Sequence, residues 1–400
     1  MEETAKQNGK TLAIIGGCGH VGLPLGMAFA EKGYKVHLID ISEKAVNMVN
    51  AGTMPFVEEE ADVLLPKVLS SGLLHATTDF GVLKETEIVI VTIGTPVDEY
   101  LDPSVHNFDE SLHRLMKEMH AGQLLVLRST VFPGVTDRLG RQLSSMGHAD
   151  IDLAYCPERI VQGQSLQELK ELPQLIGGYT EPAAKRAAEL FSCLSPTSIF
   201  LRPVEAELAK LYANAWRYIN FAISNQFWVT SQDFGADFDK IHAALKQDYP
   251  RMKSFARAGF AAGPCLLKDT MQLGAFNHGS FVLGQAAMMI NEGLPYILVQ
   301  KIKKTHDLRT MKVGILGMAF KPNNDDIRSS LSYKLRKVLL LEAKEVLCAD
   351  PYVRDPELSS QEKVLKEADL IVIGTPHDCY KTLAFRQPVV DITKTISSTK

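Results

Sequence analysis

The chain has 400 residues, of which 46% are hydrophobic and 22% are charged, and its formal net charge is -4. At roughly 100–200 residues per domain, this length predicts two or three domains with sizeable cores and excludes a disordered or fibrous chain. No apolar run approaches the roughly 18 residues of a membrane-spanning helix, and no Lys/Arg-rich tract offers a surface for a phosphate backbone. We therefore expect neither a membrane nor a nucleic acid as a partner.

The first ten residues are polar and lack the apolar stretch and small-residue cleavage site of a secretory signal. This predicts a cytoplasmic protein. The six cysteines include no C-x-x-C pair, and the eleven histidines form no His-x-His or His-Glu-x-x-His motif. We expect reduced thiols, one of them reactive, and no metal.

The sequence of the N-terminal half predicts a doubly wound parallel sheet. Residues 11–16 form a short apolar run that ends in a glycine-rich turn, residues 21–33 have helical periodicity, and residues 34–39 form a second apolar run. Further apolar runs at 87–96 and 124–130 are typical of buried parallel strands separated by segments of helical length.

A long helix follows, because neither Gly nor Pro interrupts residues 205–234 and apolar residues recur near the helical period. Its length of about 45 Å suits a bridge between domains or between subunits. The last hundred residues then repeat the opening pattern, with strands expected at 312–321, 345–351 and 368–376. The sequence thus predicts an α/β protein in which two Rossmann-like doubly wound domains, 1–200 and 301–400, are joined by a helical central and dimerisation domain, 201–300.

The motif Gly17-Cys-Gly-His-Val-Gly22 follows a predicted strand and opens a predicted helix. In this setting the glycines allow a tight turn and close approach of a dinucleotide pyrophosphate to the helix N-terminus. Asp40 ends the next strand, 18 residues after Gly22, where a carboxylate accepts from both ribose hydroxyls and repels a 2′-phosphate. The motif therefore favours NAD over NADP as cofactor, and an ordinary glycine turn with a surface aspartate is the alternative.

Cys265 is the candidate nucleophile, because Lys268 and Asp269 follow it closely and a nearby cation favours the thiolate. A buried apolar cysteine is the alternative. Lys210 and Asn214 are four residues apart on the long helix and can point an ammonium and an amide at one oxyanion.

Two alternatives remain open at this level. Glu207 and Lys210 could instead form a surface ion pair. Glu158, which follows an apolar strand, could be a general base or merely a charge at a strand end.

Taken together and in order, these motifs resemble those of the nucleotide-sugar 6-dehydrogenase family, over nearly the whole chain. The most specific elements are the glycine-rich loop, Gly94-Thr95, Ser129-Thr130, the segments 156–159 (Cys-Pro-Glu-Arg) and 317–328, Lys210 with Asn214, and Cys265 with Lys268-Asp269.

The resemblance implies a four-electron oxidation of a sugar C6 alcohol to a carboxylate, with reduction of two NAD, through a thiohemiacetal and a thioester on Cys265. It assigns the oxyanion to Lys210 and Asn214, proton transfer to Asp269, and the orientation or activation of water to Glu158. The catalytic set that it implies is Cys265, Lys210, Asn214, Asp269, Glu158 and Thr130.

It also implies two binding sites and a homodimer formed through the central helix, with Arg251 able to reach its ligand across the dimer interface. The NAD site would comprise Gly17, Gly19, His20, Val21, Gly22, Asp40, Thr95, Thr130, Glu158, Lys268 and Arg328. The UDP-sugar site would comprise Glu158, Arg159, Lys210, Asn214, Arg251, Phe260, Gly263 and Lys321.

Two features bear on the substrate. Ala261 and Ala262 stand where the family usually has a glycine pair, which predicts a changed loop geometry. The segment Cys156–Gly163 resembles the N-acetylhexosamine branch and favours UDP-N-acetylmannosamine or a related sugar. A UDP-glucose 6-dehydrogenase, a non-catalytic sugar-nucleotide sensor and a two-electron hydroxyacid dehydrogenase remain as alternatives.

Overall fold

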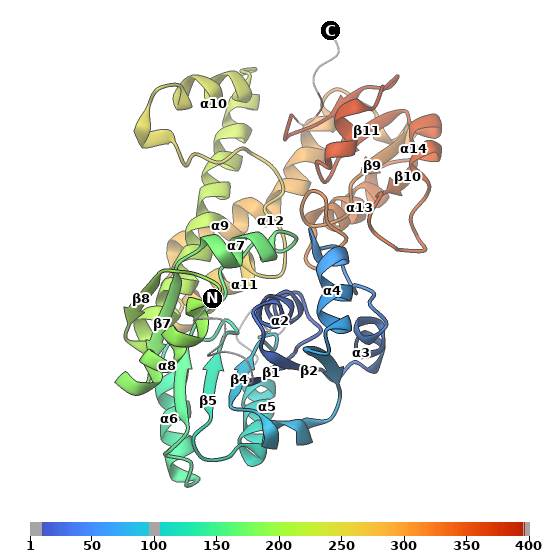
Figure 1. Cartoon of the computed structure of the whole chain (residues 1–400). Coiled ribbons are helices and arrows are strands. Elements are labelled where there is room, and N and C mark those ends of the chain that lie inside the picture. The colour runs from blue at the N-terminus through green and yellow to red at the C-terminus, as the bar shows by residue number, and fades with distance from the viewer. Residues whose placement is uncertain (1–9, 96–104, 395, 397–400) are drawn as a thin grey trace. The chain divides into compact units, whose positions relative to one another are not determined.

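The computed structural model describes residues 10–95, 105–394 and 396, and it divides into two compact units, 1–212 and 213–400 (Figure 1). The described residues therefore leave out positions 1–9, on which the prediction of a cytoplasmic protein rests. They also leave out Pro96, the last residue of one predicted strand.

The first unit contains an eight-stranded sheet in the order β3-β2-β1-β4-β5-β6-β7-β8. All neighbours pair in parallel except β6 and β7, which are antiparallel. The strands are β1 (Thr11–Ile15), β2 (Lys35–Ile39), β3 (Leu74–Thr77), β4 (Ile88–Val91), β5 (Leu124–Leu127), β6 (Asp152–Tyr155), β7 (Gln174–Gly178) and β8 (Ser198–Leu201).

Helices cover both faces of this sheet (Figure 1). The central strands are buried on both sides, which explains their continuous apolar sequences. In β1, Leu12 and Ile14 join one core cluster, while Ala13 and Ile15 join the other. The helices are α2 (Gly22–Glu31), α3 (Glu43–Asn50), α4 (Ala61–Ser70), η1 (Phe80–Glu85), α5 (Val105–Glu118), α6 (Val135–Ser145), α7 (Ser165–Glu171) and α8 (Glu181–Ser192).

Helix α9 (Pro203–Asp233) begins in the first unit and continues into the second. Its 31 residues confirm the long helix that the sequence predicts. Lys210 therefore belongs to the first unit and Asn214 to the second, one helical turn apart on one continuous helix.

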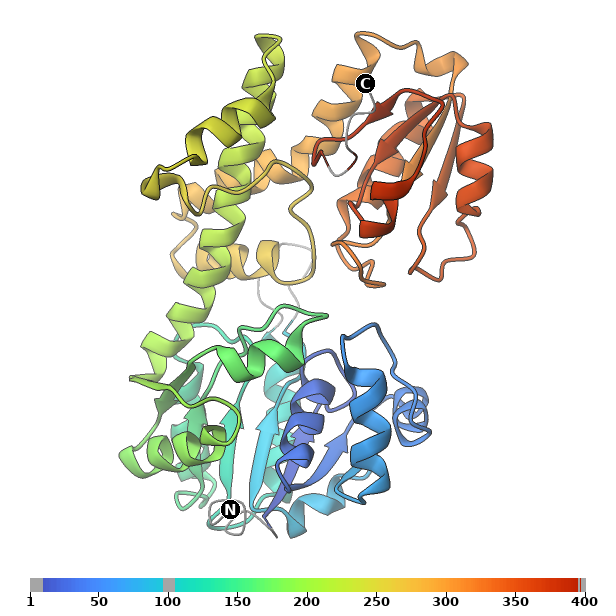
Figure 2. The same cartoon turned by 45° about the horizontal axis from the view of Figure 1, so that its top comes forward.

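The second unit contains a four-stranded parallel sheet in the order β10-β9-β11-β12 (Figure 2, orange to red). Its strands are β9 (Lys312–Leu316), β10 (Glu345–Ala349), β11 (Leu370–Ile373) and β12 (Val389–Val390). The helices of this unit, beyond α9, are α10 (Phe238–Lys246), η2 (Pro250–Met252), α11 (Leu266–Phe276), α12 (Val282–Lys303), η3 (Leu308–Thr310), α13 (Leu331–Glu342), α14 (Gln361–Glu367) and η4 (Asp378–Thr382).

Helix α12 is, by length and composition, the one described helix that could cross a membrane. It is a weak candidate, because Leu294, Leu298 and Val299 are fully or almost fully buried and belong to the core beneath the second sheet. A helix that buries one face in this way is typical of a protein core.

The predicted fold class is confirmed, with a parallel sheet in each unit and a helical segment from α9 to α12 between them in the sequence. The divisions predicted at residues 200 and 300 remain predictions.

Candidate functional site

The glycine-rich loop joins β1 to α2 and leaves no space for a side chain at Gly22. A Cβ atom on Gly22 would lie 2.5 Å from the carbonyl oxygen of Gly16 and 2.9 Å from Oγ1 of Thr92. No side chain caps the N-terminus of α2, which begins after Val21. The positive end of the helix dipole at this turn thus suits the pyrophosphate of a dinucleotide. The loop residues Gly17, Gly19, His20, Val21 and Gly22 all lie at this turn.

Asp40 follows β2 and faces this loop. One carboxylate oxygen, Oδ2, accepts from the amide of Cys18 at 3.1 Å, and the other accepts from the amide of Ser42 at 3.0 Å. The carboxylate is thereby held beside the turn, as a ribose-binding group requires. Together with the tight turn at Gly22, this position of the carboxylate fits NAD.

Thr95 and Thr130 come together at the carboxyl ends of β4 and β5. The hydroxyl of Thr95 donates to the carbonyl oxygen of Thr130 at 2.6 Å. Since cofactors bind outside the carboxyl ends of the strands of such sheets, this pair is well placed for a cofactor contact.

Glu158 lies after β6 and forms an ion pair with Arg128, whose Nη2 is 2.7 Å from Oε2. The other carboxylate oxygen accepts from the amides of Arg159 and Ile160 at 2.8 and 3.2 Å. The guanidinium of Arg159 contacts the carbonyl of Pro173. Burial lowers the pKa of Arg159, and the Glu158 carboxylate opposes that shift. Arg128, the residue directly after β5, could not be identified from the sequence, because a single charged residue at the end of an apolar strand belongs to no motif.

Cys265 is the N-cap residue of α11 and is exposed. By contrast, burial raises the pKa of Cys18, Cys156 and Cys348 to about 12, and that of Cys193 to about 11. Cys379 is exposed, but partial desolvation raises its pKa as well. A thiol at a helix N-terminus is favourably placed to act as the thiolate nucleophile.

A buried polar cluster lies one turn along α11 from Cys265. Asp269 is fully buried, and its Oδ1 is 2.6 Å from Nζ of Lys268. Its Oδ2 accepts from Nδ2 of Asn214 at 2.5 Å. The amide of Asp269 donates to the Cys265 carbonyl at 2.9 Å. These contacts bring four predicted site residues of the second unit together.

The loop before the thiol is hydrogen-bonded to Asn225 and contains two glycines with positive φ angles. The amide of Gly259 donates to Oδ1 of Asn225 at 2.8 Å, and Nδ2 of Asn225 donates to Asn291 at 2.9 Å. Gly259 has φ 156° and Gly263 has φ 107°. The conformations that require glycine therefore fall at these two positions. The changed loop geometry expected from Ala261 and Ala262 remains a prediction.

Phe260 lies in this loop, while Lys321 and Arg328 lie in the segment that follows β9. The ring of Phe320, next to Lys321, would lie 2.6 Å from a Cβ on Gly263. The Arg328 guanidinium is bound by Asp326, with Nε at 3.0 and 2.9 Å from the two oxygens. That contact is the main reason why the pKa of Arg328 is raised, and the Cys265 thiol adds to the shift. Loop 259–265 and segment 317–329 thus lie against each other.

Two predicted residues lie outside these groups of contacts. Arg251 is on η2, where its Nη1 donates to the Tyr249 hydroxyl at 3.4 Å. Lys210 is 9% exposed on α9.

The alternative of a surface ion pair between Glu207 and Lys210 is wrong, because Glu207 is fully buried. Its carboxylate accepts from the amides of Gly134 and Thr136 at 2.6 and 2.8 Å, and so ties α9 to the start of α6.

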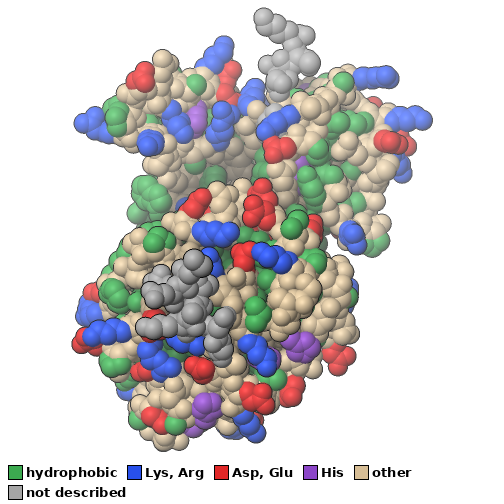
Figure 3. Space-filling model, in the orientation of Figure 1, with side chains coloured by type: hydrophobic (Ala, Val, Ile, Leu, Met, Phe, Trp, Pro, Cys, Tyr) green, Lys and Arg blue, Asp and Glu red, His purple; other side chains and the backbone are tan. Residues whose placement is uncertain are grey.

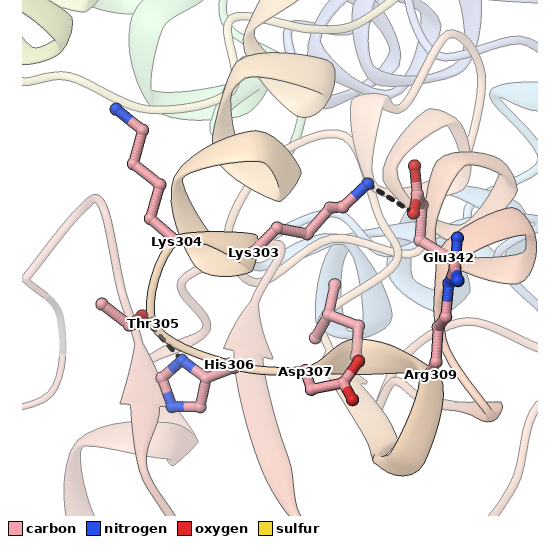
Figure 4. Close-up of a pocket in the computed structure, with 8 residues that line it drawn as sticks. Lys303, Lys304, Thr305, His306, Asp307, Arg309 and Glu342 are labelled. Atoms are coloured by element: carbon pink, nitrogen blue, oxygen red, sulfur yellow. Dashed lines mark hydrogen bonds and ion pairs between the residues drawn. The ribbon is translucent and has the colours of Figure 1, made fainter.

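A cavity of about 470 Å³ lies at the end of α12 and contains none of the predicted site residues (Figure 4). Lys303 and Glu342 form an ion pair at its rim, 2.7 Å apart. Among the described residues, no group of His, Cys, Asp and Glu could hold a metal ion. On the face drawn in Figure 3, basic and acidic side chains are interspersed.

Three family models match consecutive parts of the chain. All three describe the UDP-glucose/GDP-mannose dehydrogenase family: its NAD binding domain over residues 10–195, its central domain over 204–292 and its UDP binding domain over 314–397.

Known proteins agree with these matches. A UDP-N-acetyl-D-mannosamine dehydrogenase of Pyrococcus horikoshii is 32% identical, with 93% of this chain and 90% of that protein covered. One of Methanocaldococcus jannaschii is 30% identical, with 93% and 87% covered. The solved structure of the UDP-D-ManNAc dehydrogenase from Pyrococcus horikoshii has a TM-score of 0.89 and 29% identity, with 97% of this chain and 96% of that chain covered.

The fold and these matches define an NAD-dependent oxidoreductase of nucleotide sugars. The chain belongs to the UDP-glucose/GDP-mannose dehydrogenase family.

Proposed function

We propose that this protein oxidises the C6 alcohol of a UDP-N-acetylhexosamine, such as UDP-N-acetylmannosamine, to the uronic acid. The observation that carries the proposal is Cys265, an exposed thiol at the N-terminus of α11, one turn from the buried cluster of Asp269, Lys268 and Asn214. A two-electron alcohol dehydrogenase has no need of such a thiol.

The overall reaction consumes one water and two NAD per alcohol and yields the carboxylate, two NADH and three protons. NAD, when bound, accepts a hydride in each of two oxidations. The thiolate of Cys265 adds to the C6 aldehyde formed in the first oxidation and gives a thiohemiacetal. Loss of the second hydride leaves a thioester, which water cleaves to the acid and the free thiol. Covalent capture keeps the reactive aldehyde from escaping.

The other residues of the predicted catalytic set have separate roles in this scheme. Lys210 and Asn214 stabilise the oxyanion, whose charge develops at C6. Asp269 assists proton transfer, with its carboxylate oriented by Lys268 and Asn214. Thr130, beside Thr95, borders the nicotinamide ribose.

The substrate assignment is supported by the relatives named UDP-N-acetyl-D-mannosamine dehydrogenase. It is also supported by the Cys156–Gly163 segment, which resembles the N-acetylhexosamine branch and contains Arg159, a residue that we propose for the sugar nucleotide. A structure titled as a UDP-glucose dehydrogenase, from Pyrobaculum islandicum, has the same TM-score of 0.89 at 25% identity, so UDP-glucose is the second candidate substrate.

We also propose a cytoplasmic homodimer that forms through α9. Four large apolar residues on α9 are 41–60% exposed, and their spacing places them on one face: Tyr212, Trp216, Ile223 and Phe227. An exposed apolar stripe of this kind favours a partner. Trp216→Glu should shift the sedimentation coefficient to that of a monomer, whereas an unchanged dimer would exclude this face.

The decisive experiment for the activity is a panel of UDP- and GDP-sugars followed at 340 nm, with the acid product identified. We expect about two NADH per sugar with a UDP-N-acetylhexosamine. One NADH per sugar would indicate a simple alcohol oxidation, and none with any sugar would indicate a binding protein. A faster reaction with UDP-glucose would select the second substrate.

A further inference from the structure

Asp350 and His377 meet at the carboxyl end of the sheet in the second unit, and neither belongs to the predicted site. Asp350 directly follows β10, and His377 lies shortly after β11. Both side chains are fully buried, with Nε2 of the imidazole 2.9 Å from Oδ2 of the carboxylate. The ring centres of Tyr352 and Tyr380 lie 5.0 and 5.3 Å from that of His377. The imidazole is therefore packed in one orientation.

Asp350 occupies in the second sheet the place that Asp40 occupies in the first, directly after the strand that pairs with the first strand of the sheet. Its Oδ2 accepts from the amides of Met318 and Ala319 at 2.6 and 3.0 Å. Its Oδ1 accepts from the two amides of segment 352–353 at 2.8 and 3.1 Å. Because the carboxylate is fully buried among these donors, it holds protein segments together and contacts no ligand.

One of these segments follows β9 and contains Lys321, a member of the predicted UDP-sugar site. On one side of Lys321, the amide of Ala319 donates to Oδ2 of Asp350 at 3.0 Å. On the other side, the amide of Asn323 donates to Nδ1 of His377 at 2.9 Å. Since His377 contacts the same Oδ2, one buried pair binds the backbone on both sides of Lys321.

The turn at Asn323 has contacts with residues 377 and 378 only a few ångströms away. Asn323 has φ 54°, a left-handed conformation that is uncommon outside glycine. Its Nδ2 donates to Oδ2 of Asp378 at 2.5 Å, and its Oδ1 accepts from the Asp378 amide at 3.0 Å. His377 thus binds the backbone of Asn323, while the next residue binds its side chain.

The two nitrogens of His377 have different roles. Because Nδ1 accepts from the Asn323 amide, the proton of the imidazole lies on Nε2, which donates to Asp350. Asp350 therefore orients the ring, and the ring orients Asn323. A lysine ammonium sits on a flexible four-carbon chain, so its contribution to the binding of a diphosphate depends on where its backbone is held.

We propose that His377 is a positioning residue for the sugar nucleotide: oriented by Asp350, it holds Asn323 and thereby places Lys321 for the diphosphate. His377 touches no substrate itself, because its side chain is fully buried. The inference rests on the proposed function, which requires a UDP-sugar at Lys321.

UDP alone is the probe for the first test, because its binding does not depend on the oxidation. Titration calorimetry on the full chain measures its Kd. His377→Phe keeps the volume of the ring and loses both nitrogens. We expect the Kd for UDP and the KM for the UDP-sugar to rise about tenfold or more, whereas kcat and the KM for NAD change less than about threefold.

Two further variants separate the two nitrogens. The side-chain amide of asparagine reaches the place of Nδ1, and that of glutamine reaches the place of Nε2. His377→Asn keeps an acceptor for Asn323 and should bind UDP within about threefold of the wild type. His377→Gln keeps the donor to Asp350 and should weaken UDP binding as His377→Phe does. A purely structural role predicts the reverse order, because the buried carboxylate is the costlier group to leave without its donor.

A double variant tests whether His377 acts through the ammonium of Lys321. In the Lys321→Met background, His377→Phe should weaken UDP binding by less than about twofold, because residues that share one contact are non-additive. The matched control is Tyr380→Phe, which keeps the ring beside His377 and removes a buried hydroxyl that has no hydrogen-bond partner among the described residues. Its Kd for UDP should not change.

Four results would overturn the inference: unchanged UDP binding in His377→Phe, tighter binding by His377→Gln than by His377→Asn, additive effects of His377→Phe and Lys321→Met, or no binding of UDP by the wild type. If His377→Phe does not fold, His377→Gln replaces it, because that variant leaves Asp350 with its donor. A wild-type enzyme that binds UDP and oxidises no nucleotide sugar contradicts the proposed function instead.

Discussion

Asn214 donates from Nδ2 to Oδ2 of Asp269 at 2.5 Å, across 55 residues of sequence. The bond joins α9 to α11 and orients a fully buried carboxylate one turn from Cys265. Since an amide nitrogen carries two hydrogens, this bond leaves one for an oxyanion. Asn214 therefore has two roles available, as donor to the substrate and as anchor of Asp269.

This relationship predicts how Asn214→Ala and Lys210→Ala behave. Each should lower kcat by about 10²–10³, the scale for loss of one preorganised donor, with a smaller effect on KM. The double variant should lose much less than the product of the two single effects, because donors that act together are non-additive. Steady-state kinetics on the purified variants test this, with Gln226→Ala, an exposed position on the same helix, as control. Normal kcat in both single variants would remove the pair from the mechanism.

Cys265→Ser should lower turnover on the order of 10³-fold or more and leave NAD binding near normal. A hydroxyl is the weaker nucleophile, and its ester hydrolyses more slowly than a thioester. The matched control is Cys379→Ser, which removes the other exposed cysteine. Acid formation and NAD affinity should be measured together. Wild-type acid production by Cys265→Ser would show that catalysis does not pass through this thiol.

Asp40 should exclude the 2′-phosphate of NADP by charge repulsion. We expect kcat/KM to favour NAD by about 10²-fold or more, and Asp40→Asn to narrow this ratio. Asp62→Asn, an exposed carboxylate in the first turn of α4, is the control and should leave the ratio unchanged. Equal kcat/KM values for the two cofactors in the wild-type enzyme would contradict the prediction.

Local sequence patterns are sufficient to predict most of the fold. Buried parallel strands such as β4 and β5 are short continuous apolar runs, and α9 has no internal Gly or Pro. The edge strand β8 was not predicted, because its sequence has no alternation of apolar and polar residues. Its apolar residues Ile199 and Phe200 are exposed. The antiparallel pairing of β6 with β7 was not predicted either, because the direction of pairing depends on the connection between the strands and not on their sequences.

The partners of the site residues were harder to predict than the residues themselves. Motifs identify Glu158 and Asp269, but their contacts with Arg128 and Asn214 span 30 and 55 residues. Glu207 illustrates the same limit: its buried role is set by Thr136, 71 residues away. A single sequence contains no record of such contacts, because they form only when separate elements pack together.

Asp350 and His377 form a buried pair in the second unit, with Nε2 2.9 Å from Oδ2. Nδ1 of His377 accepts from the Asn323 amide at 2.9 Å, so the proton lies on Nε2. Burial alone would raise the pKa of Asp350, but His377 and the amides of Tyr352 and Met318 hold it below its usual range.

The pH dependence of stability follows from that lowered pKa. The unfolded carboxyl titrates near 3.9, so the Asp350 contribution is complete above about pH 4 and is lost as the pH falls through the lower folded value. Asp350→Asn should reduce the free energy of unfolding by about 1–3 kcal/mol at pH 7. The difference from wild type should shrink in acid. Denaturant titrations at several pH values measure it, and a difference independent of pH would contradict the assignment.

The last prediction compares two glycines that lie on either side of Cys265 in the sequence. Gly263 has φ 107°, and a Cβ there would lie 2.6 Å from Cδ2 of Phe320. Gly263→Ala should therefore cost about 1–3 kcal/mol of unfolding free energy and displace the loop that carries Cys265, so that alkylation of the thiol by iodoacetamide changes. Gly274 lies within α11, and a Cβ there meets nothing within 4 Å. Gly274→Ala should instead stabilise the protein by about 0.5–1 kcal/mol and leave alkylation unchanged. Equal stability changes in both variants would mean that loop 259–265 does not depend on the glycine conformation.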